Sequence, residues 1–145
     1  MRPIKFRVWE HSRRCFLSAD NNAIFIDGHG FVQVFKQQPN LYWADGSVDI
    51  MQFTGLLDKN GKEIYEGDVV KIIYLPYRNH SCVSQKEKIE PVKWGHYGDE
   101  EYVSRIECWM AGHEPLSDLG GLWGSGLHQY EVIGNIYSNP ELVSQ

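Results

Sequence analysis

The sequence lacks the features that would place it in a membrane or in a disulfide-stabilised class. No apolar run approaches the roughly 18 residues of a membrane-spanning helix. The basic residues near its start are not followed by an apolar segment, so they do not form a signal peptide. The three cysteines, Cys15, Cys82 and Cys108, are widely spaced, which is not a disulfide framework. We therefore expect reduced thiols and a cytoplasmic protein.

Motifs for common catalytic and cofactor sites are also missing. Gly-x-Ser-x-Gly is absent, and the fragment at residues 124–126 lacks the strand–turn–helix setting of a nucleophile elbow. No Gly-Lys-Ser/Thr follows the glycines around Trp123, so they do not match a phosphate-binding loop. Two loose histidine–cysteine pairs occur, His80 with Cys82 and Cys108 with His113. Neither has Cys-x-x-Cys spacing, so we expect no metal and no cofactor.

Length and charge set the next limits. A chain of 145 residues is one domain by the usual prior and can bury about 70% of its unfolded surface. Its net charge of −5 argues against broad, charge-driven nucleic-acid binding, although a local basic patch remains compatible with it. We expect a single domain over residues 1–145, with an N-terminal β region at 1–49 and a barrel at 50–145.

Residues 51–71 carry two sharp corners. Asp58-Lys59-Asn60-Gly61 has the composition of a type I turn, in which Asp58 accepts from the backbone two residues on and Gly61 takes a positive φ. Apolar runs on both sides predict a hairpin. At the second corner Gly67 permits a reversal, and Asp68 can accept from nearby backbone N–H groups. The β-branched residues 69–73 then predict a central strand that ends before Pro76.

The segment TGLLDKNGKEIYEGDVVKI resembles the central signature of the YopX family, small proteins of bacteriophages and prophages. The opening MRPIKFRVW and the ending YEVIGNIYSNPELV also resemble the family, and the order and spacing of the three segments fit it. The resemblance implies a mainly β fold, namely an SH3-like barrel with an N-terminal β-hairpin extension. It also implies a phage or prophage origin in a bacterial host, and it brings no established activity.

The barrel is expected to use residues 51–75, 91–94 and 130–137. Gly134 within the last of these strands indicates a bulge or a close backbone approach. Asn139 as a cap and Pro140 at the first position predict a short C-terminal helical turn.

The segments between the barrel strands are less clearly patterned. We expect exposed loops at residues 77–90 and 111–128, a turn at 96–101, and a strand within 102–110. In the N-terminal region, Asp27-Gly28 between two apolar runs predicts a hairpin of residues 24–26 and 31–35. Residues 41–43 are expected to form a further short strand.

The first hairpin is the candidate nucleic-acid site. Alternation predicts that Ile4, Phe6 and Val8 face a core while Lys5, Arg7 and Trp9 face outward. With residues 15–17 as the return strand, basic and aromatic residues interleave at Lys5, Arg7, Trp9, Arg13 and Arg14. The alternative is a solvated sheet face on which Trp9 covers a neighbouring element, and the acidic total favours it.

Two further groups are candidate sites. Glu63, Glu66 and Asp68 could serve as acid/base carboxylates of a small hydrolase, but Asp68 is better explained as a turn residue and the glutamates as solvated. Aromatic residues flank the barrel loops at Tyr74, Tyr77, Trp94 and Tyr97. They form either a surface that binds an extended protein segment or the cover of the barrel end. The function we expect is non-enzymatic binding of a partner protein or of a second copy, with nucleic-acid binding as the alternative.

Overall fold

The computed structural model describes residues 3–17, 22–26, 32–36, 48–74, 87–97, 106–116 and 128–143. Its strands in chain order are β1 (Phe6–Glu10), β2 (Cys15–Phe16), β3 (Asn22–Ile26), β4 (Val32–Lys36), β5 (Val48–Leu57), β6 (Glu63–Tyr65), β7 (Asp68–Tyr74), β8 (Glu87–Tyr97), β9 (Ile106–Ala111), β10 (Glu114–Pro115) and β11 (His128–Asn135). A 3-10 turn, η1 (Pro140–Leu142), follows. The chain divides into a larger unit, Met1–Lys5 with Gln52–Gln145, and a smaller unit, Phe6–Met51.

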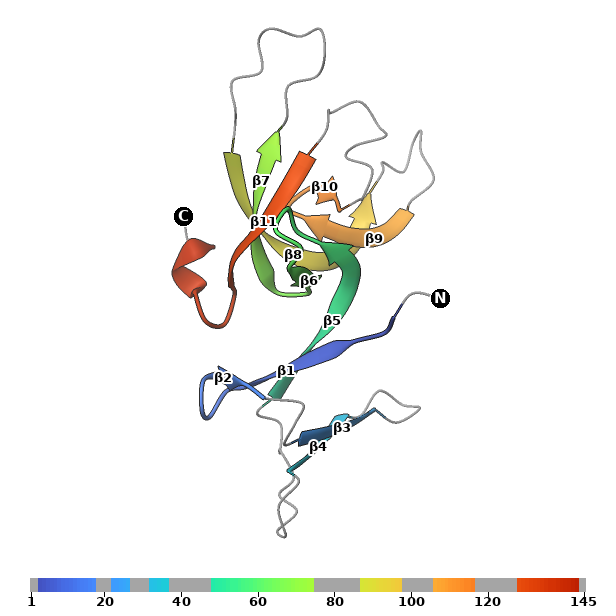
Figure 1. Ribbon diagram of the computed structural model, residues 1–145, viewed down its shortest axis with the longest axis vertical. Coiled ribbons are helices and arrows are strands. Elements are labelled where there is room, and N and C mark those ends of the chain that lie inside the picture. Colours follow the sequence, from blue (N-terminus) through green and yellow to red (C-terminus); the bar gives the residue numbers. More distant parts are fainter. Residues whose placement is uncertain are drawn as a thin grey trace, which may run out of the picture. The chain divides into compact units, whose positions relative to one another are not determined.

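The larger unit is built on a five-stranded antiparallel sheet of order β10-β9-β8-β7-β11. The sheet curls into a half-barrel (Figure 1), and the pair β5-β6 completes the unit's described strands. Strand β7 pairs with β8 on one side and β11 on the other, so the central position predicted for its β-branched run is confirmed. The mainly β class and the barrel are likewise confirmed.

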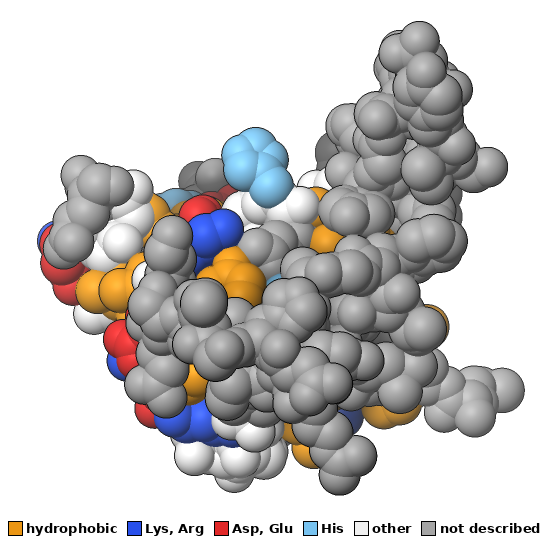
Figure 2. Space-filling model, turned by 90° about the horizontal axis from the view of Figure 1, so that it is seen from above, with side chains coloured by type: hydrophobic (Ala, Val, Ile, Leu, Met, Phe, Trp, Pro, Cys, Tyr) orange, Lys and Arg blue, Asp and Glu red, His pale blue; other side chains and the backbone are white. Residues whose placement is uncertain are grey.

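Alternate residues along the strands fill the inside of the half-barrel. The buried core consists of Ile64, Val70, Ile72, Val92, Trp109, Ala111, Leu116 and Tyr130. Burial of such apolar side chains is the main source of folding free energy, at about 25 cal/mol per Å² removed from water. On the outside, the described surface seen in Figure 2 mixes acidic, basic and apolar side chains.

The first corner has the predicted turn chemistry. Asn60 N donates to Asp58 Oδ1 at 2.8 Å, Gly61 N donates to the Asp58 carbonyl at 2.9 Å, and Gly61 has a φ of +81°. Asp58 Oδ1 also accepts from Lys62 N, and Asp58 Oδ2 accepts from Val132 N at 3.1 Å. The corner is therefore tied to strand β11 as well as closed on itself.

The second corner is also confirmed. Gly67 has a φ of +74°, which a residue with a Cβ adopts only at a cost. Its N–H donates to the Val92 carbonyl at 2.8 Å and its carbonyl accepts from Ile136 N at 2.9 Å. Asp68, 1% exposed, accepts from Tyr65 N at 2.8 Å. This corner therefore connects β6 and β7 to β8 and to the segment after β11.

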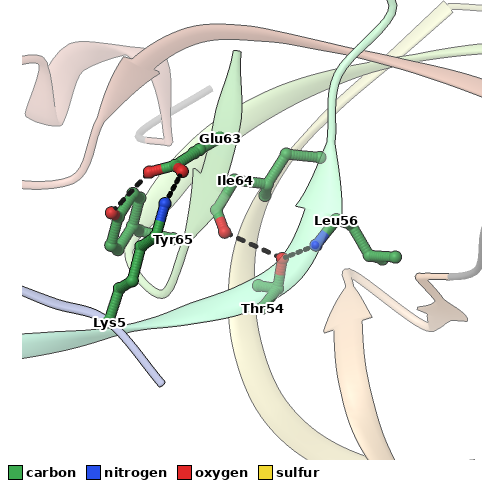
Figure 3. A network of polar contacts seen from close by, with 6 residues as sticks. All are labelled: Lys5, Thr54, Leu56, Glu63, Ile64 and Tyr65. Carbon is green, nitrogen blue, oxygen red and sulfur yellow. Dashed lines mark hydrogen bonds and ion pairs between the residues drawn. The ribbon is translucent and has the colours of Figure 1, made fainter. Parts of the chain in front are cut away.

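Strand β5 is interrupted by a bulge that the sequence did not lead us to expect. Its register with β6 shifts between Phe53 and Leu57, and Gly55 has a φ of +87°. The buried Thr54 hydroxyl donates to the Ile64 carbonyl at 2.8 Å and accepts from Leu56 N at 3.2 Å (Figure 3). One side chain thus replaces ladder bonds that the bulge removes.

The C-terminal segment packs onto β11 where Gly134 has no side chain. The register with β7 shifts between Val132 and Gly134, as predicted for a bulge. A Cβ on Gly134 would lie 2.7 Å from Leu142 Cδ1 and 2.8 Å from Asn139 Oδ1, so side chains of the C-terminal segment occupy the space that a larger residue would need. The short helical turn is present as η1, but Asn139 makes no side-chain cap hydrogen bond.

The smaller unit contains two antiparallel pairs, β1 with β2 and β3 with β4, as predicted for its two hairpins. The inward and outward assignment on the first strand is wrong in part. Val8 is fully buried, but so is Trp9 at 5% exposure, whereas Phe6 is 36% exposed. Trp9 meets the ring of Phe16 edge-on at 5.0 Å, so β1 is covered on both faces at this point. Ile4, which precedes β1 in the larger unit, is 76% exposed.

Several loop predictions are also wrong. Residues 87–90 and 96–97 belong to β8, since they pair with β7 and β9. The predicted loop at 111–128 contains β10, begins β11 at its end, and contributes Leu116 to the core. Apolar periodicity is short or absent in these stretches, and pairing with a neighbouring strand decides their conformation. The short strand expected at 41–43 and the turn at Asp27-Gly28 lie outside the described residues. Within the described part of the chain, no helix is long and apolar enough to cross a membrane.

Candidate functional site

Asp68 and Glu63, two of the three residues in the acidic group at the second corner, are engaged in structural contacts through their carboxylates. Asp68 fastens the turn through Tyr65 N, as expected. Glu63 is not merely solvated, because it pairs with Lys5 and accepts from the Tyr65 hydroxyl at 2.7 Å (Figure 3). The Lys5 hydrogen bond, followed by that of Tyr65, holds the pKa of Glu63 below its usual value. Lys5 also lies 5.3 Å from the centroid of the Phe53 ring. These contacts fix the first residues of the chain against β5 and β6.

The most heavily bonded carboxylate of the larger unit is Asp58. Burial raises the pKa of Asp58, but the backbone N–H groups of Val132, Lys62 and Asn60, with the charge of Lys62, outweigh it. The pKa therefore lies below its usual value, and the fold favours the ionised form. A carboxylate that accepts from three backbone N–H groups in this way stabilises the turn. Its pKa is too low for proton transfer near neutral pH.

The basic residues predicted for the first hairpin have different surroundings. Lys5 belongs to the larger unit and pairs with Glu63. Arg7 lies over the Phe16 ring at 4.7 Å, and its Nε is 3.3 Å from Met51 Sδ.

At the tip of that hairpin, Arg13 lies 3.6 Å from Glu10, while Arg14 is exposed with a φ of +53°. With Trp9 buried, the interleaving of basic and aromatic residues in the sequence is not an interleaving on the surface. The predicted role of these residues in nucleic-acid binding stays a prediction.

No group of three or more potential metal ligands occurs within the described ranges. His80 and Cys82, and the glycine-rich segment around Ser125, lie outside them. Cys108 is half-buried with its sulfur 3.4 Å from Met110 Sδ, and burial raises the pKa of the Cys108 thiol. A raised pKa disfavours the reactive thiolate.

The aromatic candidates separate into two places on the larger unit. Trp94 is a register partner of Trp109, and their rings meet edge-on with centroids 5.0 Å apart. Trp109 is 7% exposed whereas Trp94 is 52% exposed. The half-exposed Trp94 indole therefore packs edge-on against the buried Trp109 indole of the neighbouring strand.

Tyr74 is the second place. It packs edge-on against the His128 ring, with centroids 4.6 Å apart, and Lys88 Nζ lies 5.6 Å from the Tyr74 centroid. Tyr77 is outside the described residues, and of Tyr97 only the backbone position in β8 is described. The sequence did not single out Trp109, Lys88 or His128, because their relation to Trp94 and Tyr74 depends on strand register.

An arrangement of this kind suits recognition of another molecule by contact. Exposed aromatic side chains on a rigid sheet provide apolar area at low entropic cost, and such residues dominate binding energy at protein interfaces. The carboxylates, by contrast, are occupied in turns and in pairing. The geometry therefore favours the aromatic candidates over the acidic ones.

Comparison with known proteins gives the family. A search of curated proteins finds no match. Among solved structures, the chain resembles the crystal structure of protein EF1440 from Enterococcus faecalis, at 25% sequence identity and a TM-score of 0.52, covering 99% of this chain and all of the other. The family model described as YopX protein matches residues 5–144. The resemblance carried by the three sequence segments is thereby confirmed, and the chain belongs to the YopX family.

Proposed function

We propose that this YopX chain is a non-enzymatic phage or prophage accessory protein that binds another protein in the bacterial cytoplasm. The family resemblance supports the phage or prophage origin, and a solved structure of similar fold comes from a bacterium. The engagement of Asp58, Glu63 and Asp68 in turns and pairs supports a role other than acid/base chemistry.

The observation that carries the proposal is the exposure of Trp94. Its register partner Trp109 is buried in the core and meets the Trp94 ring edge-on, a contact that restricts the exposed ring before binding. Preorganised aromatic anchors reduce the entropy lost on binding. Trp94 is therefore the anchor of the binding surface.

Affinity capture from a bacterial host lysate with quantitative mass spectrometry tests this role. The wild-type chain is expected to enrich one partner at near-stoichiometric amount, and Trp94→Ala is expected to lose most of it. Ile89→Ala is the matched control, because Ile89 is also exposed on β8 but has the opposite alternation. Equal recovery by both variants, or no enriched partner at all, would contradict the proposal.

Nucleic-acid binding is the second candidate, and one observation favours it. Arg13 and Arg14 are exposed at the tip of the first hairpin. If they contact phosphates, the double variant Arg13→Ala, Arg14→Ala reduces the slope of log affinity against log salt concentration by about two. Gel shifts at a series of salt concentrations measure this, with Lys93→Ala as the control. No shift for the wild-type chain would remove this candidate.

A further inference from the structure

The first corner of the larger unit carries the dipeptide Asn60-Gly61 at the surface. Both residues are exposed, and a Cβ built on Gly61 would meet no atom within 4 Å. An asparagine followed by glycine is chemically labile, because glycine has no side chain to hinder attack by its own backbone nitrogen on the asparagine side chain. The corner therefore presents two neighbouring residues that can react with each other.

The other asparagines whose side chains the structure describes lack this combination. Asn135 is 4% exposed, and the β-branched Ile136 follows it and crowds its own nitrogen. Asn139 precedes Pro140, which has no backbone N–H to become a nucleophile. Among these asparagines, only Asn60 combines an exposed side chain with the N–H of a following glycine.

The reaction open to this pair is deamidation, with water as the co-reactant. Hydroxide removes the Gly61 N–H proton, the nitrogen bonds to Asn60 Cγ, and the side-chain amide leaves as ammonia. Water then opens the resulting succinimide ring. Attack at Cγ gives aspartate, whereas attack at the main-chain carbonyl gives isoaspartate, in which the chain runs through the former side chain. The net change is one water consumed and one ammonia released.

Two hydrogen bonds of the folded corner oppose this reaction. Gly61 N donates to the Asp58 carbonyl at 2.9 Å, and Asn60 N donates to Asp58 Oδ1 at 2.8 Å. The Asp58 carboxylate also accepts from Lys62 N and Val132 N. The Gly61 nitrogen must leave its hydrogen bond before it can attack Asn60 Cγ. A slow reaction of a transiently open form proceeds in proportion to the population of that form.

We propose that Asn60 is a site of spontaneous deamidation whose rate is controlled by Asp58 through opening of the first corner. The carboxylate that ties the corner to β11 thereby also protects the neighbouring dipeptide from reaction. Isoaspartate at position 60 places one additional atom in the main chain, so the turn bond from Gly61 N to the Asp58 carbonyl is lost. Deamidation also adds a negative charge two residues from Asp58. The product is a loosened corner, and this inference is independent of the proposed function.

Incubation of the full chain between pH 7 and pH 9, followed by peptide mapping with mass spectrometry, tests the proposal. Electron-transfer fragmentation distinguishes isoaspartate from aspartate. We expect Asn60 to convert at a rate that rises with hydroxide concentration, while Asn135 and Asn139 stay unchanged. Asn60→Gln should remove the signal, because the longer side chain would have to close a six-membered ring.

The role of Asp58 is tested by substitution. Asp58→Ala leaves the backbone donors of the corner without their acceptor, so Asn60 should convert at least about fivefold faster than in the wild-type chain. Asp49→Ala is the matched control, since it removes a surface carboxylate of the smaller unit, and should change the rate less than about twofold.

A second measurement uses the wild-type chain alone, in case Asp58→Ala does not fold. Unfolding in urea releases Gly61 N from its hydrogen bond, so conversion should again be at least about fivefold faster than in the folded chain. Equal rates in the folded and unfolded chain, or in wild type and folded Asp58→Ala, overturn control by the corner. Absence of conversion at Asn60, or equal conversion of Asn135 in the folded chain, overturns the site itself.

Discussion

Two turns of this protein are similarly rich in charged residues, and they use the charges in opposite ways. At the first corner of the larger unit, Asp58 is 7% exposed and accepts three backbone N–H groups. At the tip of the first hairpin in the smaller unit, residues 11–14 are exposed. His11 of this tip lies 2.7 Å from Asp49 on β5, and Arg13 lies 3.6 Å from Glu10, in side-chain pairs at the surface.

The difference shows what makes a charged turn structural. A carboxylate that replaces water with backbone donors is costly to remove, because its donors are then left unpaired. A surface pair is in competition with water and salt and contributes little. The hairpin is instead held by apolar contact, through Trp9 and Phe16. At the first corner, loss of the carboxylate should lower the free energy of unfolding most. At the hairpin, loss of an apolar side chain should lower it more than loss of a charge.

The largest effect is expected at Trp9. Trp9→Ala removes a buried ring and should lower the free energy of unfolding of the smaller unit by about 3–5 kcal/mol. Hydrogen exchange of the amides in Phe6–Met51, followed with increasing urea, measures it. Trp94→Ala is the control, since half of that ring is already in water, and should cost the larger unit about 1 kcal/mol. Similar costs for the two tryptophans would contradict the assigned burial.

Asp58→Ala comes next. It leaves the N–H groups of Asn60, Lys62 and Val132 without their acceptor, and we expect a loss of about 3 kcal/mol in the free energy of unfolding. Asp49→Ala, which removes the partner of His11 at the hairpin tip, should cost less than about 1 kcal/mol. Urea denaturation monitored by circular dichroism compares the two. If Asp49→Ala costs as much as Asp58→Ala, the distinction between the turns fails.

Acid should act on the same corner. The pKa of Asp58 is lowered in the folded chain, so folding favours the ionised carboxylate. Its contribution is present above the unfolded-state pKa of about 4 and is lost as the pH falls through the lower folded-state value. Glu63 contributes with the same sign. Denaturation midpoints measured from pH 6 downward should decrease below about pH 4, and Asp58→Asn should flatten that decrease. An unchanged slope in Asp58→Asn would exclude Asp58 as its source.

Turn chemistry could be predicted because it is local. Asp58 supplies the side-chain acceptor of the first corner, and Gly61 and Gly67 permit the positive φ values. The structure has this hydrogen bond and these φ values. Gly134 was similarly informative, because a glycine inside a strand often marks a bulge, and the register shifts there, with side-chain atoms of Leu142 and Asn139 close to the glycine. The local sequence did not show which distant residue each corner bonds to, such as Val132, whose N–H donates to Asp58.

Exposure of aromatic residues could not be predicted, because it depends on strands far apart in the chain. Alternation placed Trp9 outside, but Phe16 covers it there. Trp94 and Trp109 are partners in the β8–β9 register. The sequence predicted a turn from residue 96, so it did not predict this pairing. The surroundings of Trp94 and of Tyr74 depend on such registers, which explains why the sequence indicated these two residues without their neighbours.

The smallest expected effect is at Lys5. Its pairing with Glu63 joins the first residues of the chain to β6, but both side chains are partly exposed, at 45% and 36%. Solvent competes with such a pair, so Lys5→Ala should cost only about 0.5 kcal/mol, and moderate salt should reduce that cost. A double-mutant cycle of Lys5→Ala with Glu63→Gln isolates the pairwise coupling from the contact of the Lys5 ammonium with the Phe53 ring. A coupling as large as the cost of Asp58→Ala would mean that surface pairing can fasten this fold as strongly as a buried carboxylate, and the contrast between the two turns would no longer hold.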